Sequence, residues 1–208
     1  MLAGSIGLDT VAARINVADA INDLHIEKLG PFSVDTASNL LIELSKAYTK
    51  GFKQPVIVHI IARVGEKWLV PYYLQLVFHE LRQLPEPVGT TEVDQAIECL
   101  LGPSRRNYFD YWRERLIEQL GTTDARHAFA LLNECCYSAQ GSSRRALVAR
   151  FMVVIPDASL REDKLRYLLD LLQNDGYLVE HEGGEWTFIS PLLREFWRRR
   201  VAPPLEAR

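Results

Sequence analysis

The sequence predicts a mainly α-helical fold with one small β-hairpin near its C-terminal end. Two observations lead to this prediction. Apolar residues recur at helical spacing through most of the chain, in segments bounded by Gly, Pro or capping residues. Towards the end of the chain, two short strand-like runs, 177–181 and 186–189, flank the pair Gly183 and Gly184. A Gly-Gly pair between such runs is typical of a hairpin.

Composition places the chain among ordinary globular proteins. Its 208 residues suffice for one large or two small domains, and 48% of them are hydrophobic. The formal net charge of −3 provides no general attraction to nucleic acid or to an anionic membrane. No apolar run approaches the roughly 18 residues of a membrane span, and the first ten residues do not resemble a signal peptide. Because of this charge and hydropathy, we expect no contact with membranes. Cys135 and Cys136 are typical of buried thiols in a reducing compartment, so we expect a cytoplasmic protein.

The N-terminal half contains four segments with the periodicity of amphipathic helices. Ser33 is a suitable N-cap for the first of them, and Gly51 is expected to end it. Pro55 and Pro71 suit the first turns of the second and third helices. The four predicted helices run, in order, from Ser33 to Gly51, from Pro55 to Gly65, from Pro71 to about Leu84, and over 92–101.

In the C-terminal half, the sequence predicts a helix over 108–120 that ends at Gly121, followed by a compact motif. Three helices are expected in this motif, and an apolar and basic helix follows the hairpin. The third helix carries one apolar stripe, because its leucines lie at i, i+3, i+4 and i+7. Three helices followed by a two-stranded hairpin form the outline of a winged helix. The motif helices cover about 124–138, 144–152 and 160–174, and the stripe is Leu165, Leu168, Leu169 and Leu172.

Several segments, in a characteristic order, resemble prokaryotic AAA-like P-loop ATPases of the STAND and archaeal-ATPase type. The resemblance begins with LAGSIGLDTVAARI and IEKLGPFSVDTASNLLIELS, which are similar to the region after the family's sensor-1 strand. It continues with GEKWLVPYYLQLVFHEL, similar to a lid segment in which a Pro-Tyr pair opens a helix near the adenine pocket. The later segments are FDYWRERL and DGYLVEHEGGEWTFISPLLREFWRRR, the second of which looks like the family's winged-helix end.

This resemblance implies a domain organisation and a function. It assigns 1–32 to the end of the P-loop core sheet, 33–102 to a helical lid, and 103–208 to a linking helix and a winged helix. The implied function is to couple nucleotide state to the binding of DNA or a protein partner. The chain has no Gly-x-x-x-x-Gly-Lys-Ser/Thr motif. Phosphoryl transfer depends on such a loop, its Lys and a metal. We therefore expect ATP with magnesium to bind only when an N-terminal ATPase core, in the same or a separate chain, is supplied, and no ATPase activity from this chain alone.

The resemblance also implies three nucleotide-contacting residues. Pro71 and Tyr72 would offer adenine a flat apolar wall at a helix N-terminus, where free N–H groups favour an anion. Alternatively, Pro71 is an ordinary first helical residue and Tyr72 belongs to the core. Ser5 lies where the family's strand ends near the γ-phosphate, and its hydroxyl could bond a phosphate or the attacking water. Turn formation explains Gly4 and Ser5 equally well.

Five basic residues are candidates for nucleic-acid binding. In a winged helix the third helix reads the groove, and here it carries Arg161, Lys164 and Arg166. Arg144 and Arg145 could bind phosphates, or could simply be a solvated helix end. The same motif is acidic at its hairpin, and over 141–208 it holds 11 Arg and Lys against 10 Asp and Glu. The alternatives to a nucleotide-coupled module are therefore a free-standing DNA-binding regulator and a protein-interaction scaffold. The five histidines show no zinc spacing, so no metal site is predicted.

Overall fold

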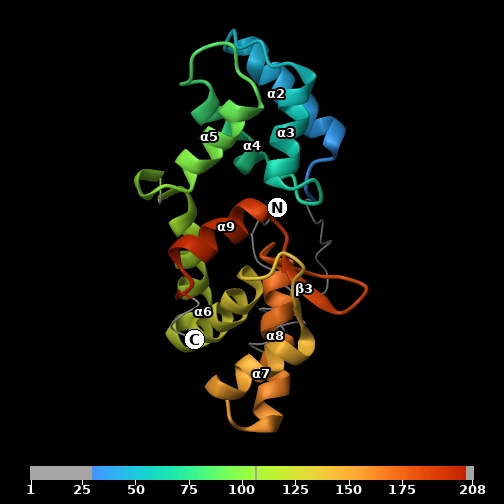
Figure 1. Cartoon of the computed structure of the whole chain (residues 1–208). Helices are drawn as coiled ribbons and strands as arrows, with labels where there is room; N and C mark the ends of the chain where they lie inside the picture. Colours follow the sequence, from blue (N-terminus) through green and yellow to red (C-terminus); the bar gives the residue numbers. More distant parts are fainter. Residues whose placement is uncertain (1–29, 106, 205–208) are drawn as a thin grey trace, which may run out of the picture. The chain divides into compact units, whose positions relative to one another are not determined.

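The structure is a computed structural model of the chain and describes residues 30–105 and 107–204. Over these residues it is mainly helical with one small antiparallel sheet (Figure 1), which confirms the predicted class. Most of the segment predicted as a core remnant, 1–32, lies outside the described residues. No helix in the described ranges is both long enough and apolar enough to cross a bilayer.

Contacts divide the chain into two compact units. Among the described residues, the helical unit comprises 30–119 and 189–204, and the mixed unit comprises 120–188. These units differ from the predicted segments 33–102 and 103–208, because the linking helix and the last helix group with the N-terminal helices. The chain therefore leaves the helical unit once and returns to it after the hairpin.

The helical unit is a set of α-helices around a core of large apolar side chains. Ser33 caps the first helix, since its Oγ accepts a hydrogen bond of 3.1 Å from the backbone N–H of Thr36. Leu41, Ile60 and Trp197 are completely buried. Burial of an aliphatic side chain such as Leu41 or Ile60 stabilises the folded state by roughly 1.5–3 kcal/mol. The unit contains α2 (Val34–Ala47), α3 (Gln54–Val64), α4 (Pro71–Leu81), α5 (Thr90–Leu100), η2 (Pro103–Arg105), the first part of α6 (Asn107–Cys136) and α9 (Pro191–Arg200).

The end of α2 differs from the prediction. The helix stops at Ala47 rather than near Gly51, and Thr49 adopts a left-handed backbone conformation with φ 56°. The backbone N–H of Thr49 donates to the Lys46 carbonyl, and that of Lys50 donates to the Ser45 carbonyl at 2.7 Å. This is the hydrogen-bond pattern of a Schellman motif, with threonine in the position that usually holds glycine.

Helix α9 completes the helical unit through contacts with α3, α5 and α6. The Ser190 hydroxyl accepts from the Leu193 N–H and donates to the Val64 carbonyl, each at 3.3 Å. The rings of Phe196 and Phe109 stack with centroids 4.7 Å apart. Arg199 holds both carboxylate oxygens of Glu98, at 2.7 and 3.0 Å.

The mixed unit begins at a break inside α6. Gly121 has φ 70° and ψ 170°, which interrupts the helix where the sequence predicted an end. The following elements are β1 (Ser142–Ser143), α7 (Arg144–Val154), α8 (Ala158–Asn174), β2 (Leu178–Glu180) and β3 (Glu185–Phe188). The sheet has the order β1-β3-β2 and all its pairs are antiparallel. The predicted hairpin is present, whereas β1 was missed because a two-residue strand has no periodicity to detect.

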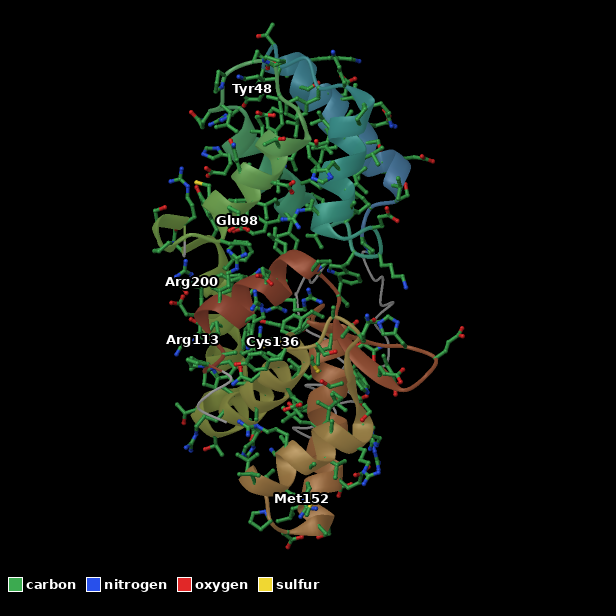
Figure 2. All side chains as sticks on the ribbon, viewed as in Figure 1. Tyr48, Glu98, Arg113, Cys136, Met152 and Arg200 are labelled. Atoms are coloured by element: carbon green, nitrogen blue, oxygen red, sulfur yellow. The ribbon has the colours of Figure 1, made fainter. Side chains whose placement is uncertain are left out.

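The core of the mixed unit is formed by α6, α7, α8 and the sheet. The four leucines of the predicted α8 stripe are all buried, which confirms that stripe. Cys135 and Cys136 (the latter labelled in Figure 2) are buried free thiols, as expected, and burial raises the pKa of Cys135 to about 12. Such a thiol stays protonated and behaves as a small apolar side chain. The other large core residues are Leu131, Leu147, Phe151, Tyr177, Trp186 and Phe188.

Candidate functional site

The start of α4 carries the two described residues of the predicted nucleotide contact. Pro71 is the first helical residue, and the N-cap Val70 supplies no side-chain hydrogen bond. Tyr72 is 41% exposed, and its hydroxyl donates to the Tyr108 carbonyl at 2.8 Å. Partial burial, followed by the neighbouring Tyr108, raises the pKa of Tyr72. Its neighbour Tyr73, only 1% exposed, is the core residue at this point.

The start of α4 presents a partly exposed ring beside an uncapped helix end. The exposed side of Tyr72 is available for stacking, and the first turn of α4 lacks a side-chain cap. The third predicted contact, Ser5, lies outside the described residues. In the described ranges no three His, Cys, Asp or Glu side chains gather as a metal site would require.

Lys164 on α8 does not extend freely towards solvent. Its ammonium lies 2.7 and 2.8 Å from the two carboxylate oxygens of Asp124 on α6. Asp124 is only 6% exposed, so its charge depends on this partner. His127, one turn further along α6, lies 3.8 Å from the same carboxylate, and burial is the main cause that lowers the pKa of His127. Lys164 is thus a structural ion-pair partner.

Two further predicted DNA-binding residues also have intramolecular partners. Arg161 donates from Nε to the Ile155 carbonyl at 2.8 Å and from Nη2 to the Pro156 carbonyl. Arg144 forms an ion pair with Glu162 across α7 and α8. The guanidinium of Arg161 therefore fixes the α7–α8 turn, and the charge of Arg144 is balanced locally.

The remaining two candidates are solvent-facing. Arg145 on α7 and Arg166 on α8 are exposed, and they form no ion pair with another described side chain. Of the five predicted residues, Arg145 and Arg166 are therefore the two whose side chains form no ion pair or hydrogen bond among the described residues, and they lie on different helices.

The hairpin, which would be the wing of a winged helix, carries acidic side chains. Glu180 and Glu182 are exposed, and Glu185 is partly exposed. The turn is closed by the His181 N–H, which donates to the Glu185 carbonyl at 2.9 Å. His181 Nε2 lies 2.7 Å from the Thr187 hydroxyl, so this ring is also engaged. The hairpin surface is consequently negative near the turn.

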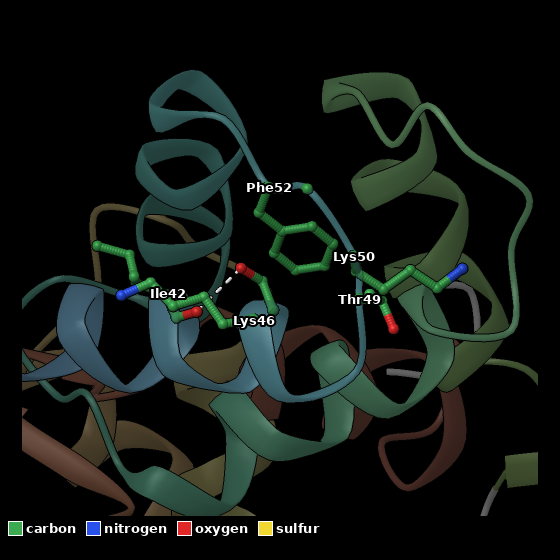
Figure 3. A pocket seen from close by; sticks show the side chains of 7 residues that line it. Ile42, Lys46, Thr49, Lys50 and Phe52 are labelled. Atoms are coloured by element: carbon green, nitrogen blue, oxygen red, sulfur yellow. Dashed lines mark hydrogen bonds between the residues drawn. The ribbon is translucent and has the colours of Figure 1, made fainter.

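An open hollow of about 480 Å³ lies beside the end of α2 (Figure 3). Its cations are already engaged, since Lys46 Nζ lies 2.8 Å from Glu43 and Lys50 Nζ donates to the Leu84 carbonyl at 2.8 Å. The hollow therefore offers a ligand little unmatched charge. Its lining consists of Ile42, Ser45, Lys46, Thr49, Lys50, Gly51 and Phe52.

Four large apolar side chains are exposed where α7 ends and α8 begins. We call them the apolar tip, and Met152 is labelled within it in Figure 2. The sequence prediction missed this feature. Its signal is the run of apolar residues after Phe151, which one helix face cannot bury. The apolar tip consists of Met152, Val153, Val154 and Leu160, which are 53%, 79%, 40% and 63% exposed.

Comparison with protein-family models, with curated proteins and with solved structures found no match.

Proposed function

We propose that the mixed unit is a winged-helix module that binds a protein partner. Its element order supports this proposal: the second part of α6, then β1, α7, α8, β2 and β3. The sheet order β1-β3-β2 places the first short strand against the last, next to the hairpin. In this assignment α8 is the third helix of the module and β2–β3 is its wing.

The main observation in favour of a protein partner, rather than DNA, is that cations of α7 and α8 are engaged within the unit. For Lys164 to bind a phosphate, the buried carboxylate of Asp124 would lose its partner, at a cost of about 1–3 kcal/mol. Arg161 would release two backbone carbonyls. DNA binding gains its affinity from unpaired Lys and Arg that displace counterions. Three of the six cations on α7 and α8 do not meet that condition, namely Arg144, Arg161 and Lys164.

The acidic hairpin supports the same choice. In a DNA complex the wing lies close to the sugar-phosphate backbone, where Lys and Arg are favourable. Here the exposed carboxylates of Glu180 and Glu182 would face phosphates of the same charge. A positively charged or neutral protein surface avoids this repulsion.

We further propose that the helical unit is the lid of an AAA/STAND-like ATPase. The support is the sequence resemblance together with the partly exposed ring of Tyr72 at the uncapped start of α4. A P-loop core in the same or a separate chain would supply the phosphate and Mg²⁺ contacts. Nucleotide state would then alter the lid, and the lid would alter the availability of the mixed unit to its partner.

A salt-dependent DNA titration tests the choice of partner. We expect the chain to bind a fluorescent 30-base-pair duplex no more tightly than non-specific binders do, with Kd of about 10⁻⁴ M or weaker at 0.15 M salt. Submicromolar affinity with a steep salt dependence, lost in Arg145→Ala and Arg166→Ala, would instead support the DNA-binding regulator. The matched control is Gln173→Ala, an exposed change on α8 that removes no charge.

The lid assignment has a separate test. With the chain joined to a P-loop core, Tyr72→Ala should weaken ATP binding about tenfold through loss of stacking. Tyr111→Ala is the control, because Tyr111 is 56% exposed in the same unit but lies outside the Pro-Tyr segment. Equal ATP affinity in the Tyr72→Ala variant and the unaltered protein would contradict the assignment.

A further inference from the structure

The apolar tip is the most exposed group of large apolar side chains described in the mixed unit. Val153 and Leu160 are 79% and 63% exposed, although most other apolar residues of α7 and α8 are well covered. Single exposed apolar residues are common, whereas several in one place mark interaction sites. The four residues belong to two successive elements joined by the short turn 155–157.

The turn that presents the apolar tip is fixed by hydrogen bonds. Asp157 caps α8 by accepting from the backbone N–H groups of Ser159 and Leu160, at 2.9 and 3.2 Å. Arg161 holds the Ile155 and Pro156 carbonyls from the other side. A surface ordered before binding loses little conformational entropy when a partner covers it. The tip therefore suits a partner with a defined shape.

Two arginines close in sequence to the apolar tip have no ion-pair partner among the described residues. Residues 144–161 contain four arginines, of which Arg144 pairs with Glu162 and Arg161 donates to backbone carbonyls. Arg145 is exposed on α7, and Arg150 is partly exposed one turn before Val154. A partner protein that covers the tip binds most favourably if it places carboxylates next to these two arginines.

We propose that the apolar tip docks into an apolar groove with an acidic rim on a partner protein. This inference rests on the proposed protein-binding function and names the surface that performs it. Val153 and Leu160 would enter the groove, and Arg145 and Arg150 would meet the carboxylates of its rim.

The apolar tip could instead bind an anionic lipid surface, but the carboxylate of Asp157 makes binding to such a surface unfavourable. This carboxylate lies in the turn between Val154 and Leu160, and its hydrogen bonds, first that of the Ser159 hydroxyl, lower the pKa of Asp157. Insertion of the tip into a bilayer would carry an ionised group towards lipid phosphates and hydrocarbon, which is unfavourable. A protein groove can instead provide a donor for this carboxylate.

Site-specific photo-crosslinking in cells of the native host tests the proposal. The photoreactive amino acid p-benzoylphenylalanine replaces Val153, or replaces Gln173, an exposed control position on α8, in the full chain. We expect a discrete adduct with one protein from position 153 only, mapped by mass spectrometry to an apolar segment flanked by Asp or Glu. The charge-reversed variant Arg145→Glu with Arg150→Glu should reduce its yield at least about tenfold.

Four results would overturn the proposal: adducts with lipids only, equal adducts at both positions, no adduct at 153, or an adduct that survives charge reversal. Unchanged circular dichroism melting shows that each variant still folds. A third crosslinker at Glu182 separates this proposal from the function on which it rests. A protein adduct at position 182 without one at position 153 would show that the module binds a protein, but not through the apolar tip. High-affinity DNA binding would reject the function itself.

Discussion

Gly65 and Pro191, 126 positions apart in the sequence, lie in direct contact where α3 ends and α9 begins. A Cβ atom built on Gly65 would come within 2.5 Å of Cδ of the Pro191 ring. Gly65 also has φ 113°, a conformation that residues with a side chain rarely adopt. Glycine is therefore required here for two independent reasons, the backbone conformation and the close approach of α9.

The first prediction is that Gly65→Ala destabilises the protein by about 2 kcal/mol or more, because the methyl group meets both strain and the Pro191 ring. Urea denaturation measures the change. Gly51→Ala is the matched control, since a Cβ atom added there would meet no atom within 4 Å and the φ of Gly51 is not positive. A Gly65→Ala variant as stable as the control would show that α9 does not depend on this contact.

The same pair illustrates what the sequence can and cannot predict. Gly65 was predicted to end a helix, and it does, because helix ends are determined by neighbouring residues. Its second role could not be predicted, since the contact with Pro191 depends on α9 returning to the helical unit. Local patterns predicted most helices and the hairpin. They did not predict that the last helix groups with the first ones rather than with the hairpin before it.

The second prediction concerns Thr49, a β-branched residue with φ 56° at the end of α2. This conformation costs a residue with a side chain roughly 1–2 kcal/mol and costs glycine almost nothing. Thr49→Gly should therefore raise the free energy of unfolding by about 1 kcal/mol, as measured by urea denaturation. The control is Thr91→Gly, a change inside the first turn of α5, which should destabilise by about 0.3 kcal/mol because glycine has a lower helix propensity than threonine. A destabilised Thr49→Gly variant would indicate that the threonine side chain makes a favourable contact in the hollow.

The third prediction separates two basic residues of α8 that look equivalent in the sequence. Lys164→Met should destabilise the protein by about 2 kcal/mol, because the buried carboxylate of Asp124 loses its ammonium partner. Arg166→Met should change stability by less than about 0.5 kcal/mol, since Arg166 is exposed. Thermal unfolding of both variants measures the difference. Equal effects would mean that the Lys164–Asp124 pair contributes nothing specific.

These two residues also show why the candidate site was only partly predictable. Helical spacing identified Arg161, Lys164 and Arg166 as the basic residues of α8. Spacing cannot show that Asp124, 40 positions earlier, neutralises Lys164, or that Arg161 turns back to the carbonyls of its own turn. A count of charges therefore overestimates the cations available to a phosphate. The number of cations that can bind a phosphate depends on which of them form ion pairs or hydrogen bonds within the fold.

The fourth prediction is a pH dependence that originates in α9. Arg198, and then Arg199, hydrogen-bond the carboxylate of Glu195 and lower the pKa of Glu195 from 4.5 to about 2. In the unfolded chain this carboxylate takes up its proton near pH 4.5, before the folded protein does. Its contribution to stability is therefore complete above about pH 5 and is lost as the pH falls from about 4.5 to 2.

Glu195→Gln should consequently destabilise the protein by about 1 kcal/mol at pH 7, a modest value because the side chain remains 21% exposed and solvent screens part of the interaction. The difference from the unaltered protein should shrink as the pH approaches 2. Urea midpoints at pH 7, 5, 4 and 3 measure this trend. Glu118→Gln, an exposed change in the same unit, should show no such convergence. A Glu195→Gln deficit that is constant from pH 7 to 3 would mean that the glutamate stabilises α9 by packing rather than by its charge.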